Sequence, residues 1–242
     1  MSFNNKVVLV TGASSGIGAA IALKFAEEGA NVAIVGRNED KLKNVTENIA
    51  KVGNKPLVIV ADMTKDNDVQ RIVNETLKQF GKLDVLVNNA GVGGNFDITD
   101  ENAMKRYDNI ISTNLRRYII ETKGNIINIS SVAGQLVWEN GFAYCTSKAA
   151  LDHFSRAIAL DFAPKGVRVN TISPGPVMTD IFETLGYKSE AFTAMIDGLI
   201  QKTALKRISD PAEMAELALF LASDKAVGIT GSTYVTDNGF ML

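Results

Sequence analysis

Short apolar runs alternate with longer segments in which apolar and polar positions follow a helical period. The first run, residues 6–10, is rich in β-branched side chains, and residues 16–28 then place Ile17, Ile21 and Phe25 along one helical face before Gly29. The same order of strand and helix repeats as far as residue 88. It predicts strands at 6–10, 31–36, 55–61 and 83–88, and helices at 16–28, 39–52 and 67–80.

The second half of the chain continues this order less regularly. It predicts strands at 125–129, 167–172 and 232–235, and helices at 143–162 and 211–221, the last beginning at Pro211. Residues 179–203 scatter Met, Phe, Leu and Ile among polar residues, which favours a mobile helical flap over a site.

Alternating strands and helices predict a parallel sheet, because parallel strands need helical crossovers. The runs 32–35 and 57–60 are apolar throughout, which is typical of strands covered by helices on both faces. A chain of 242 residues, 46% of them hydrophobic, suits one well-filled core. We therefore expect a single α/β domain over residues 1–242, with a doubly wound parallel sheet.

Charge and composition narrow the class of function. The net charge is −2 and no lysine- or arginine-rich block occurs, so nucleic acid is not an expected partner. No apolar run approaches the roughly 18 residues of a membrane span, and the polar start lacks the apolar core of a signal peptide, so we expect a cytoplasmic protein. The single cysteine excludes an internal disulfide and a cysteine-based metal cluster, and no metal is expected.

Tyr144 and Lys148 form the most informative pair of side chains. Residues four apart lie on one helical face, so the Lys148 ammonium can stabilise the ionised Tyr144 phenol, whose free pKa is ~10. Ser131 lies upstream and can hydrogen-bond a reacting oxygen. The arrangement indicates proton transfer coupled to hydride transfer.

A glycine-rich segment between the first strand and the first helix indicates a nucleotide site. Residues 11–18 read TGASSGIG, and such glycines let the backbone approach a pyrophosphate at a helix N-terminus. Because the spacing is not the commoner G-x-G-x-x-G, a merely tight turn is the alternative reading.

Residues after the next strands indicate which nucleotide binds. Arg37 stands where many dinucleotide folds carry an acidic residue, and a guanidinium can clamp a 2′-phosphate, so NADP is favoured over NAD. A solvated loop charge is the alternative for Arg37. Asp62 is a candidate for the adenine edge, and residues 88–91 would follow the fourth strand at the cleft.

Taken together, these segments resemble the classical short-chain dehydrogenase/reductases along nearly the whole chain. TGASSGIG at 11–18, NNAG at 88–91, NISS ending at Ser131, YCTSK at 144–148 and SPGPVMT at 173–179 occur in the family order. The resemblance implies a Rossmann-like sheet, NAD(P)(H)-dependent carbonyl reduction or alcohol oxidation, and a homo-oligomer, a tetramer or dimer.

The resemblance also implies individual roles. Tyr144 exchanges a proton with the substrate oxygen, Lys148 supports it and binds the nicotinamide ribose, Ser131 orients the substrate, and Asn114 supports a water path. Pro174, Gly175 and Val177 would frame the nicotinamide, with the Val177 backbone at its carboxamide, and Thr179 would contact the carboxamide or a phosphate. The expected catalytic residues are Asn114, Ser131, Tyr144 and Lys148, and the expected cofactor-binding residues are Gly12, Ser14, Ser15, Gly16, Ile17, Gly18, Arg37, Asp62, Asn89, Ala90, Gly91, Tyr144, Lys148, Pro174, Gly175, Val177 and Thr179.

The segment between Asn114 and Ser131 departs from the family pattern. It is about ten residues shorter, equivalent to ~15 Å of helix. The helical apolar stripe is interrupted at residues 115–118, which favours missing residues at this join over a true deletion.

Other reactive side chains have simpler readings. We expect His153 to be a surface or packing residue, Cys145 to be a buried inert thiol, and Ser131 not to be a hydrolase nucleophile, because no G-x-S-x-G surrounds it. Five apolar side chains could line a substrate cleft or pack in the core, with equal weight for the two alternatives: Leu136, Trp138, Phe142, Phe182 and Leu185.

The leading hypothesis is an NADP(H)-dependent oxidoreductase for a small to medium, partly apolar ketone or secondary alcohol, such as a 3-oxoacyl thioester, a steroid or a xenobiotic carbonyl. A catalytically silent nucleotide-binding regulatory or scaffold protein, and an NAD-dependent alcohol dehydrogenase, are the alternatives.

Overall fold

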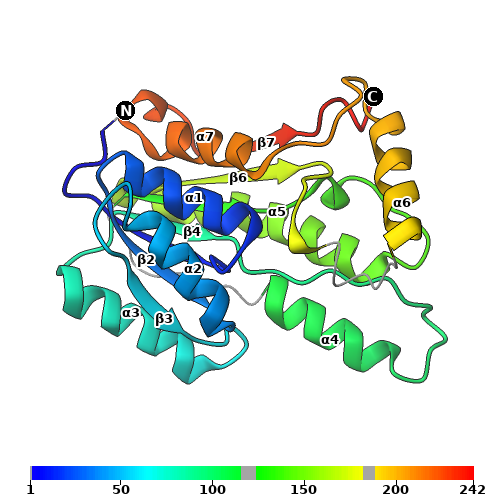
Figure 1. Cartoon of the computed structure of the whole chain (residues 1–242), viewed down its shortest axis with the longest axis horizontal. Helices are drawn as coiled ribbons and strands as arrows, with labels where there is room; N and C mark the ends of the chain where they lie inside the picture. Colours follow the sequence, from blue (N-terminus) through cyan, green and yellow to red (C-terminus); the bar gives the residue numbers. More distant parts are fainter. Residues whose placement is uncertain (1, 116–123, 182–188) are drawn as a thin grey trace.

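A seven-stranded parallel sheet forms the centre of the computed structural model, which describes residues 2–115, 124–181 and 189–242 (Figure 1). The strand order is β3-β2-β1-β4-β5-β6-β7. The strands are β1 (Val7–Thr11), β2 (Asn31–Gly36), β3 (Leu57–Val60), β4 (Val85–Asn88), β5 (Asn125–Ile129), β6 (Arg168–Pro174) and β7 (Thr233–Thr236).

Helices cover both faces of this sheet. Helices α1, α2 and α7 pack on one face in one hydrophobic cluster, and α3 and α5 pack on the other face in a second cluster. Figure 1 shows α1 beside α7, and α4 packs against α5. The helices are α1 (Gly16–Glu27), α2 (Glu39–Ile49), α3 (Asp66–Phe80), α4 (Ala103–Asn114), α5 (Phe142–Phe162), α6 (Ser189–Lys202) and α7 (Pro211–Ala222).

Strand β1 shows why a central strand carries a run of consecutive apolar residues. Successive side chains of a strand point to opposite faces, so Val8 and Val10 join the cluster under α1 while Val7 and Leu9 join the cluster under α3 and α5. All four side chains are at most 1% exposed. The predicted fold class, a Rossmann-like doubly wound parallel sheet in a single domain, is confirmed.

The ends of several elements differ from the sequence prediction. The helix predicted to reach residue 52 ends at Ile49, because the chain turns there and Gly53 packs against the carbonyl of Ala26. A Cβ on Gly53 would lie only 2.6 Å from that oxygen. The third strand is likewise shorter, since Lys55 and Pro56 precede the ladder.

Two regions add to the prediction. Helix α4 was not expected from periodicity, because its buried face at Ala103, Ile110, Thr113 and Asn114 is half polar and does not form an apolar stripe. The expected flap contains α6, which confirms a helix over its described part, whereas residues 182–188 lie outside the described residues.

The sheet places its functional edge at the point where strand order reverses. Strands β1 and β4 are neighbours, and the chain leaves them toward opposite sides of the sheet. In open parallel sheets a crevice forms at the carboxyl ends of such strands, where the following loops separate. The segments after β1 and β4 are the glycine-rich segment and the NNAG segment.

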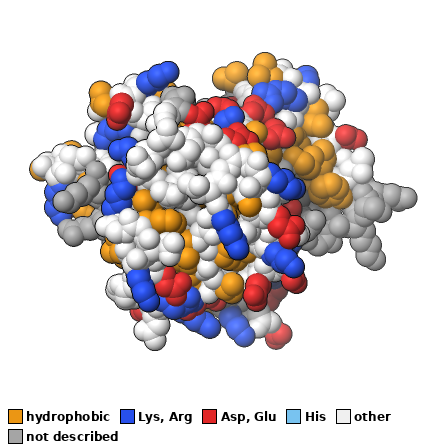
Figure 2. Space-filling view, turned by 60° about the vertical axis from the view of Figure 1, so that its left-hand side comes forward, with side chains coloured by type: hydrophobic (Ala, Val, Ile, Leu, Met, Phe, Trp, Pro, Cys, Tyr) orange, Lys and Arg blue, Asp and Glu red, His pale blue; other side chains and the backbone are white. Residues whose placement is uncertain are grey.

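The surface carries both signs of charge. Figure 2 shows lysine, arginine and acidic side chains intermixed over the visible face, without a continuous band of one sign. In the part of the chain that the structure describes, no helix is long and apolar enough to cross a membrane.

Candidate active site

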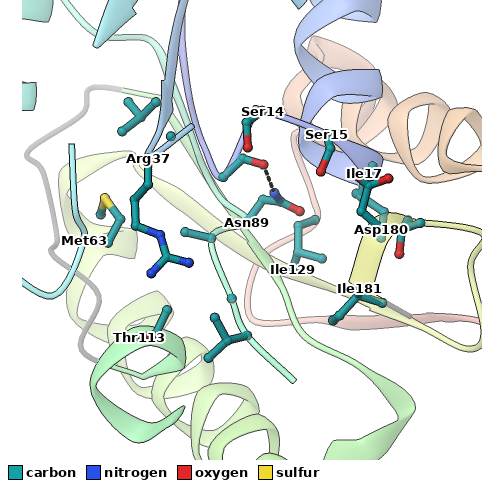
Figure 3. A pocket seen from close by; sticks show the side chains of 18 of the residues that line it. Ser14, Ser15, Ile17, Arg37, Met63, Asn89, Thr113, Ile129, Asp180 and Ile181 are labelled. Atoms are coloured by element: carbon teal, nitrogen blue, oxygen red, sulfur yellow. Dashed lines mark hydrogen bonds between the residues drawn. The ribbon is translucent and has the colours of Figure 1, made fainter. Parts of the chain in front are cut away.

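A cavity of about 500 Å³ opens at the carboxyl edge of the sheet. Figure 3 shows Arg37 and Met63 on one side of it and Ile17, Asp180 and Ile181 on the other. Of the residues expected from the sequence, the cavity is lined by Gly12, Ser14, Ser15, Gly16, Ile17, Arg37, Asp62, Asn89, Ala90, Gly91, Tyr144, Lys148 and Thr179. The structure therefore brings the glycine-rich segment and the Tyr144–Lys148 pair to one cavity.

Other expected residues lie around the cavity without lining it: Gly18, Asn114, Ser131, Pro174, Gly175 and Val177. Gly18 packs against Asn89, and Gly175 packs against Asp237, whose Cα would lie 2.7 Å from an added Cβ. Val177 is 5% exposed and pairs with Ser209 in a short bridge. Cofactor contact by Gly18, Pro174, Gly175 and Val177 stays a prediction, as do the catalytic roles of Asn114 and Ser131.

The glycine-rich turn needs glycine for two separate reasons. Gly12 and Gly16 have φ of 64° and 55°, the left-handed region that side chains disfavour. Space is also short, because a Cβ on Gly12 would lie 2.7 Å from Ala90 Cα, and one on Gly16 would lie 3.0 Å from Thr179 Cγ2. The turn then leads into α1, whose first backbone N–H groups are left unpaired by the helix and suit an anion.

Thr11 and Asn89 join this turn to the end of β4. The Asn89 side chain donates hydrogen bonds of 3.0 Å to the carbonyls of Thr11 and Gly12. The Thr11 hydroxyl in turn accepts from the backbone N–H groups of Asn89 and Ala90, each at 3.1 Å. These bonds hold the floor of the cavity in place within the protein itself.

Helix α5 carries Tyr144 and Lys148, the pair predicted to transfer a proton. Lys148 is 3% exposed, its Nζ donates a 3.0 Å hydrogen bond to the carbonyl of Ile129, and it lies 5.5 Å from the centre of the Tyr144 ring. A cation at this range favours the phenolate over the phenol. The two groups thus lie on one helical face, beside the end of β5, as the spacing predicts.

Ser131 and Asn114 surround this pair from two neighbouring segments. Ser131 caps a short 3-10 turn, η1 (Val132–Gly134), where its Oγ accepts from Ala133 N at 3.2 Å and contacts the carbonyl of Pro174 at 3.5 Å. Asn114 is fully buried at the end of α4. Its carboxamide bonds both backbone groups of Val92, at 2.8 and 3.0 Å.

Asn114 is therefore fixed beside the lysine. A Cβ on Gly91 would lie 3.3 Å from Asn114 Oδ1 and 3.8 Å from Lys148 Nζ, so the three residues meet at one point. The shortened join that follows Leu115 falls on residues 116–118, outside the described residues. Among the described residues, Asn114 lies near Lys148.

The far end of the cavity is polar. Arg37 is exposed and points toward the cavity in Figure 3, and among the described residues it forms no ion pair with a carboxylate. Asp62 accepts hydrogen bonds from the backbone and hydroxyl of Thr64, at 2.9 and 2.8 Å, and the backbone bond is the main reason that its pKa is lowered. Arg37 lowers this pKa further.

Sequence reasoning missed several lining residues, of which Lys41 and Asp180 are the most consequential. They form an ion pair across the cavity, and this hydrogen bond lowers the pKa of Asp180, with a smaller contribution from the Ser15 hydroxyl. Lys41 lies in the first turn of α2, capped by Asn38, and that cap was a usable signal for its position. Asn38, Met63, Val92, Thr113 and Ile181 were also missed.

The remaining candidate residues, Cys145, His153 and Phe142, do not line the cavity. Cys145 is buried, and burial raises the pKa of its thiol, while His153 is exposed beside Arg156. Phe142 belongs to the core, where it meets the rings of Phe96 and Tyr107. The described residues contain no cluster of three or more side chains suited to a metal ion.

Comparisons with known proteins agree with this geometry. The family model described as enoyl-(acyl carrier protein) reductase matches residues 12–241. Glucose 1-dehydrogenase of Gluconobacter oxydans is 37% identical over 99% of this chain and 93% of its own length. The 3-oxoacyl-(acyl-carrier-protein) reductase of Staphylococcus epidermidis is 34% identical over 98% of this chain and 100% of its own.

Solved structures show the same likeness. L-sorbose reductase from Gluconobacter frateurii, complexed with NADPH and L-sorbose, superposes with a TM-score of 0.91 at 30% identity, covering 100% of this chain and 98% of its own. A short-chain dehydrogenase/reductase of unknown function from Caenorhabditis elegans, solved with cofactor, has a TM-score of 0.91 at 33% identity, with 99% and 96% covered. The chain thus belongs to the short-chain dehydrogenase/reductase family of oxidoreductases, which bind a nicotinamide cofactor.

Proposed function

We propose that this protein is an NADP(H)-dependent oxidoreductase that reduces the carbonyl, or oxidises the secondary alcohol, of a small to medium, partly apolar substrate. The observation that carries the proposal is the position of Tyr144 and Lys148, which line the same cavity as the glycine-rich turn. A nucleotide site and a proton-transfer pair in one cavity suit this chemistry better than nucleotide binding alone.

The wall of the cavity at the glycine-rich turn suits a dinucleotide. Gly12 and Gly16 allow the turn its left-handed backbone and its close packing against Ala90 and Thr179, and the start of α1 favours the negative charge of a pyrophosphate. Arg37 supplies a cation for a 2′-phosphate at the ribose end. When bound there, the nicotinamide would supply or accept the hydride.

The protein's own side chains would donate and accept the proton of the reaction. During reduction, Tyr144 Oη would donate its proton to the substrate oxygen, and during oxidation it would remove that proton. The buried Lys148 ammonium favours the phenolate that remains, and Asn114 holds the backbone of Val92 beside it. Ser131 would hydrogen-bond the substrate oxygen.

Preference for NADP over NAD is supported by Arg37, and preference for reduction in cells would follow from it. The NADPH in the sorbose reductase structure is a property of that relative and adds only indirect support. We further propose a cytoplasmic homo-oligomer, a tetramer or dimer, whose partner is a small molecule rather than nucleic acid or a membrane.

Substituting Tyr144→Phe should lower kcat by about 10²- to 10⁴-fold, because the ring stays but the proton donor is lost. NADPH binding, followed by quenching of protein fluorescence, should stay within about twofold. The assay is consumption of NADPH over a panel of ketones and aldehydes. Full activity in the variant would remove Tyr144 from the mechanism.

A folded wild-type protein that binds NADPH but consumes none with any carbonyl, and forms none with any alcohol, would favour a catalytically silent nucleotide-binding protein. The intact Tyr144, Lys148 and Ser131 argue against that reading.

Substituting Arg37→Asp should weaken NADP binding by about 10- to 100-fold, because a charged hydrogen bond is replaced by repulsion. NAD binding should change little or improve, since NAD lacks the 2′-phosphate. Titration calorimetry with both nucleotides checks this, and Arg37→Lys is the matched control that keeps the charge but loses the planar fork. Equal losses for both nucleotides would contradict the NADP assignment.

A further inference from the structure

Trp138 stands next to the proton donor without lining the cofactor cavity. Its ring centre lies 6.2 Å from that of Tyr144, with the two planes at 45°, and its side chain is 42% exposed. Cofactor binding therefore does not account for an indole at this place.

Two contacts fix the position of the indole. Trp138 Nε1 donates a 3.1 Å hydrogen bond to Asn95 Oδ1, which tethers the ring to the segment after β4. The pyrrole part of the ring also lies against Gly141, where an added Cβ would be 2.6 Å from Cε2 and 2.7 Å from Cδ1. Gly141 has φ of −92°, so its role here is to leave space rather than to permit an unusual backbone.

The residues near Asn95 and Trp138 are in turn attached to the hydrophobic core. Phe96 N donates a 3.0 Å hydrogen bond to the carbonyl of Asn140, and the Phe96 ring packs edge-on against Phe142 at 5.1 Å. The Arg106 guanidinium covers the other part of the Phe96 ring at 4.6 Å. The segments on both sides of Trp138 are thus anchored, and the ring cannot swing away without breaking these contacts.

A fixed indole at this distance leaves little room beside the phenol. The 6.2 Å between the two ring centres, with the planes tilted by 45°, is a distance at which aromatic rings contact each other. The indole therefore fills the space on this side of the phenol, and a bulky substrate group there would have to displace it.

We propose that Trp138 is a specificity-determining residue that limits the size of the substrate group next to the Tyr144 phenol. The inference rests on the proposed function and adds which carbonyl compounds the site accepts: those with one small substituent on the carbonyl carbon, on the side of Trp138. Asn95 and Gly141 set the limit indirectly, by holding the ring.

The test compares ketones that have two bulky substituents with ketones that have one. Acetophenone carries a methyl and a phenyl group, whereas benzophenone carries two phenyl groups. With NADPH, Trp138→Ala should raise kcat/KM for benzophenone relative to acetophenone by at least tenfold, as expected when a pocket wall is removed. Trp138→Phe should give a smaller shift in the same direction.

Gly141→Ala provides an independent variant that keeps Trp138. Its backbone conformation suits alanine, but the new methyl group would displace the indole, so the benzophenone to acetophenone ratio should also rise. Val137→Ala is the matched control, because Val137 precedes Trp138 and is 86% exposed. It should leave the ratio within about twofold.

A second readout does not need turnover. Trp138 is the only tryptophan of the chain, so its emission reports a ligand beside the Tyr144 ring. In the Tyr144→Phe variant, acetophenone should change this emission saturably, and NADPH affinity should be the same in wild-type and Trp138→Ala protein.

The outcomes separate the two proposals. Wild-type turnover of acetophenone with an unchanged ratio in Trp138→Ala and Gly141→Ala would overturn the role of Trp138 and leave the proposed function standing. NADPH binding with no turnover of any carbonyl compound would overturn the proposed function, and the size limit with it.

Discussion

Asp152 is a buried carboxyl group one helical turn beyond Lys148. It is 7% exposed, and its Oδ1 has no hydrogen-bond partner among the described residues. The η1 turn presses on it closely, since a Cβ on Gly134 would lie 2.5 Å from Asp152 Oδ2. Burial raises the pKa of Asp152, while the Ser130 hydroxyl and then Lys148 and Arg156 lower it to a lesser extent. Ionisation of Asp152 is therefore less favourable in the folded protein than in the unfolded chain.

Substituting Asp152→Asn should stabilise the protein at neutral pH, because it removes a charge that is costly to bury. The proton of Asp152 adds stability fully below the ordinary pKa of an aspartate, about 3.9, and this is lost as pH rises through the higher folded-state value. We expect a rise in Tm of about 2–4 °C at pH 7, the shift given by 1 kcal/mol in a domain of this size. The difference should shrink toward pH 4, as thermal unfolding at several pH values would show; a lower Tm at pH 7 would contradict it.

At the scale of elements, the Lys41–Asp180 ion pair joins α2 to the segment after β6 across the cavity. Asp180 also contacts the Ser15 hydroxyl, at the start of α1. A carboxylate therefore stands where the glycine-rich turn would receive a pyrophosphate.

Substituting Asp180→Asn should tighten NADPH binding by about two- to fivefold, because one exposed like charge leaves the site. Since the pKa of Asp180 is lowered, its charge is lost only as pH falls below about 3.9, and the effect should be constant from about pH 6 to 8. Titration of nucleotide fluorescence measures it. Glu47→Gln, an exposed acid on α2 outside the cavity, should leave affinity unchanged; weaker binding to Asp180→Asn would contradict the expectation.

Elements and motif residues were predictable to different degrees. The strands and most helices follow from burial on two faces, which imposes apolar runs and a helical period, while their ends depend on contacts such as Gly53 against Ala26. Gly12 and the Tyr144–Lys148 pair were found because their roles require a particular residue type at a particular spacing. Lys41, Thr113 and Asp180 were not, because their arrival at the cavity depends on the path of the folded chain.

At the scale of the molecule, two hydrophobic clusters sandwich one sheet. Phe25 on α1 is fully buried, and the Phe3 ring meets it edge-on at 4.9 Å, so the N-terminal segment is fastened to the same cluster. The cluster extends from α1 to α7, near the end of the chain. Loss of packing at Phe25 should thus lower the free energy of unfolding of the whole domain.

Substituting Phe25→Ala should lower the free energy of unfolding by about 3–5 kcal/mol, through lost burial and the cavity that remains. Val52→Ala, at a side chain that is 44% exposed, should change it by less than about 0.5 kcal/mol. Urea unfolding of both variants checks this. A loss below about 1 kcal/mol for Phe25→Ala would mean that the cluster closes over the missing ring.

Cys145 gives the molecule a natural reporter of its own motions. It is the only cysteine, it is buried, and it follows Tyr144 in the first turn of α5. A thiol-reactive dye needs both access and a thiolate, so it labels only those molecules in which the start of α5 has locally opened. The labelling rate therefore measures how often the segment that carries Tyr144 opens, and its slowing by a bound nucleotide or ketone would measure occupancy without any turnover.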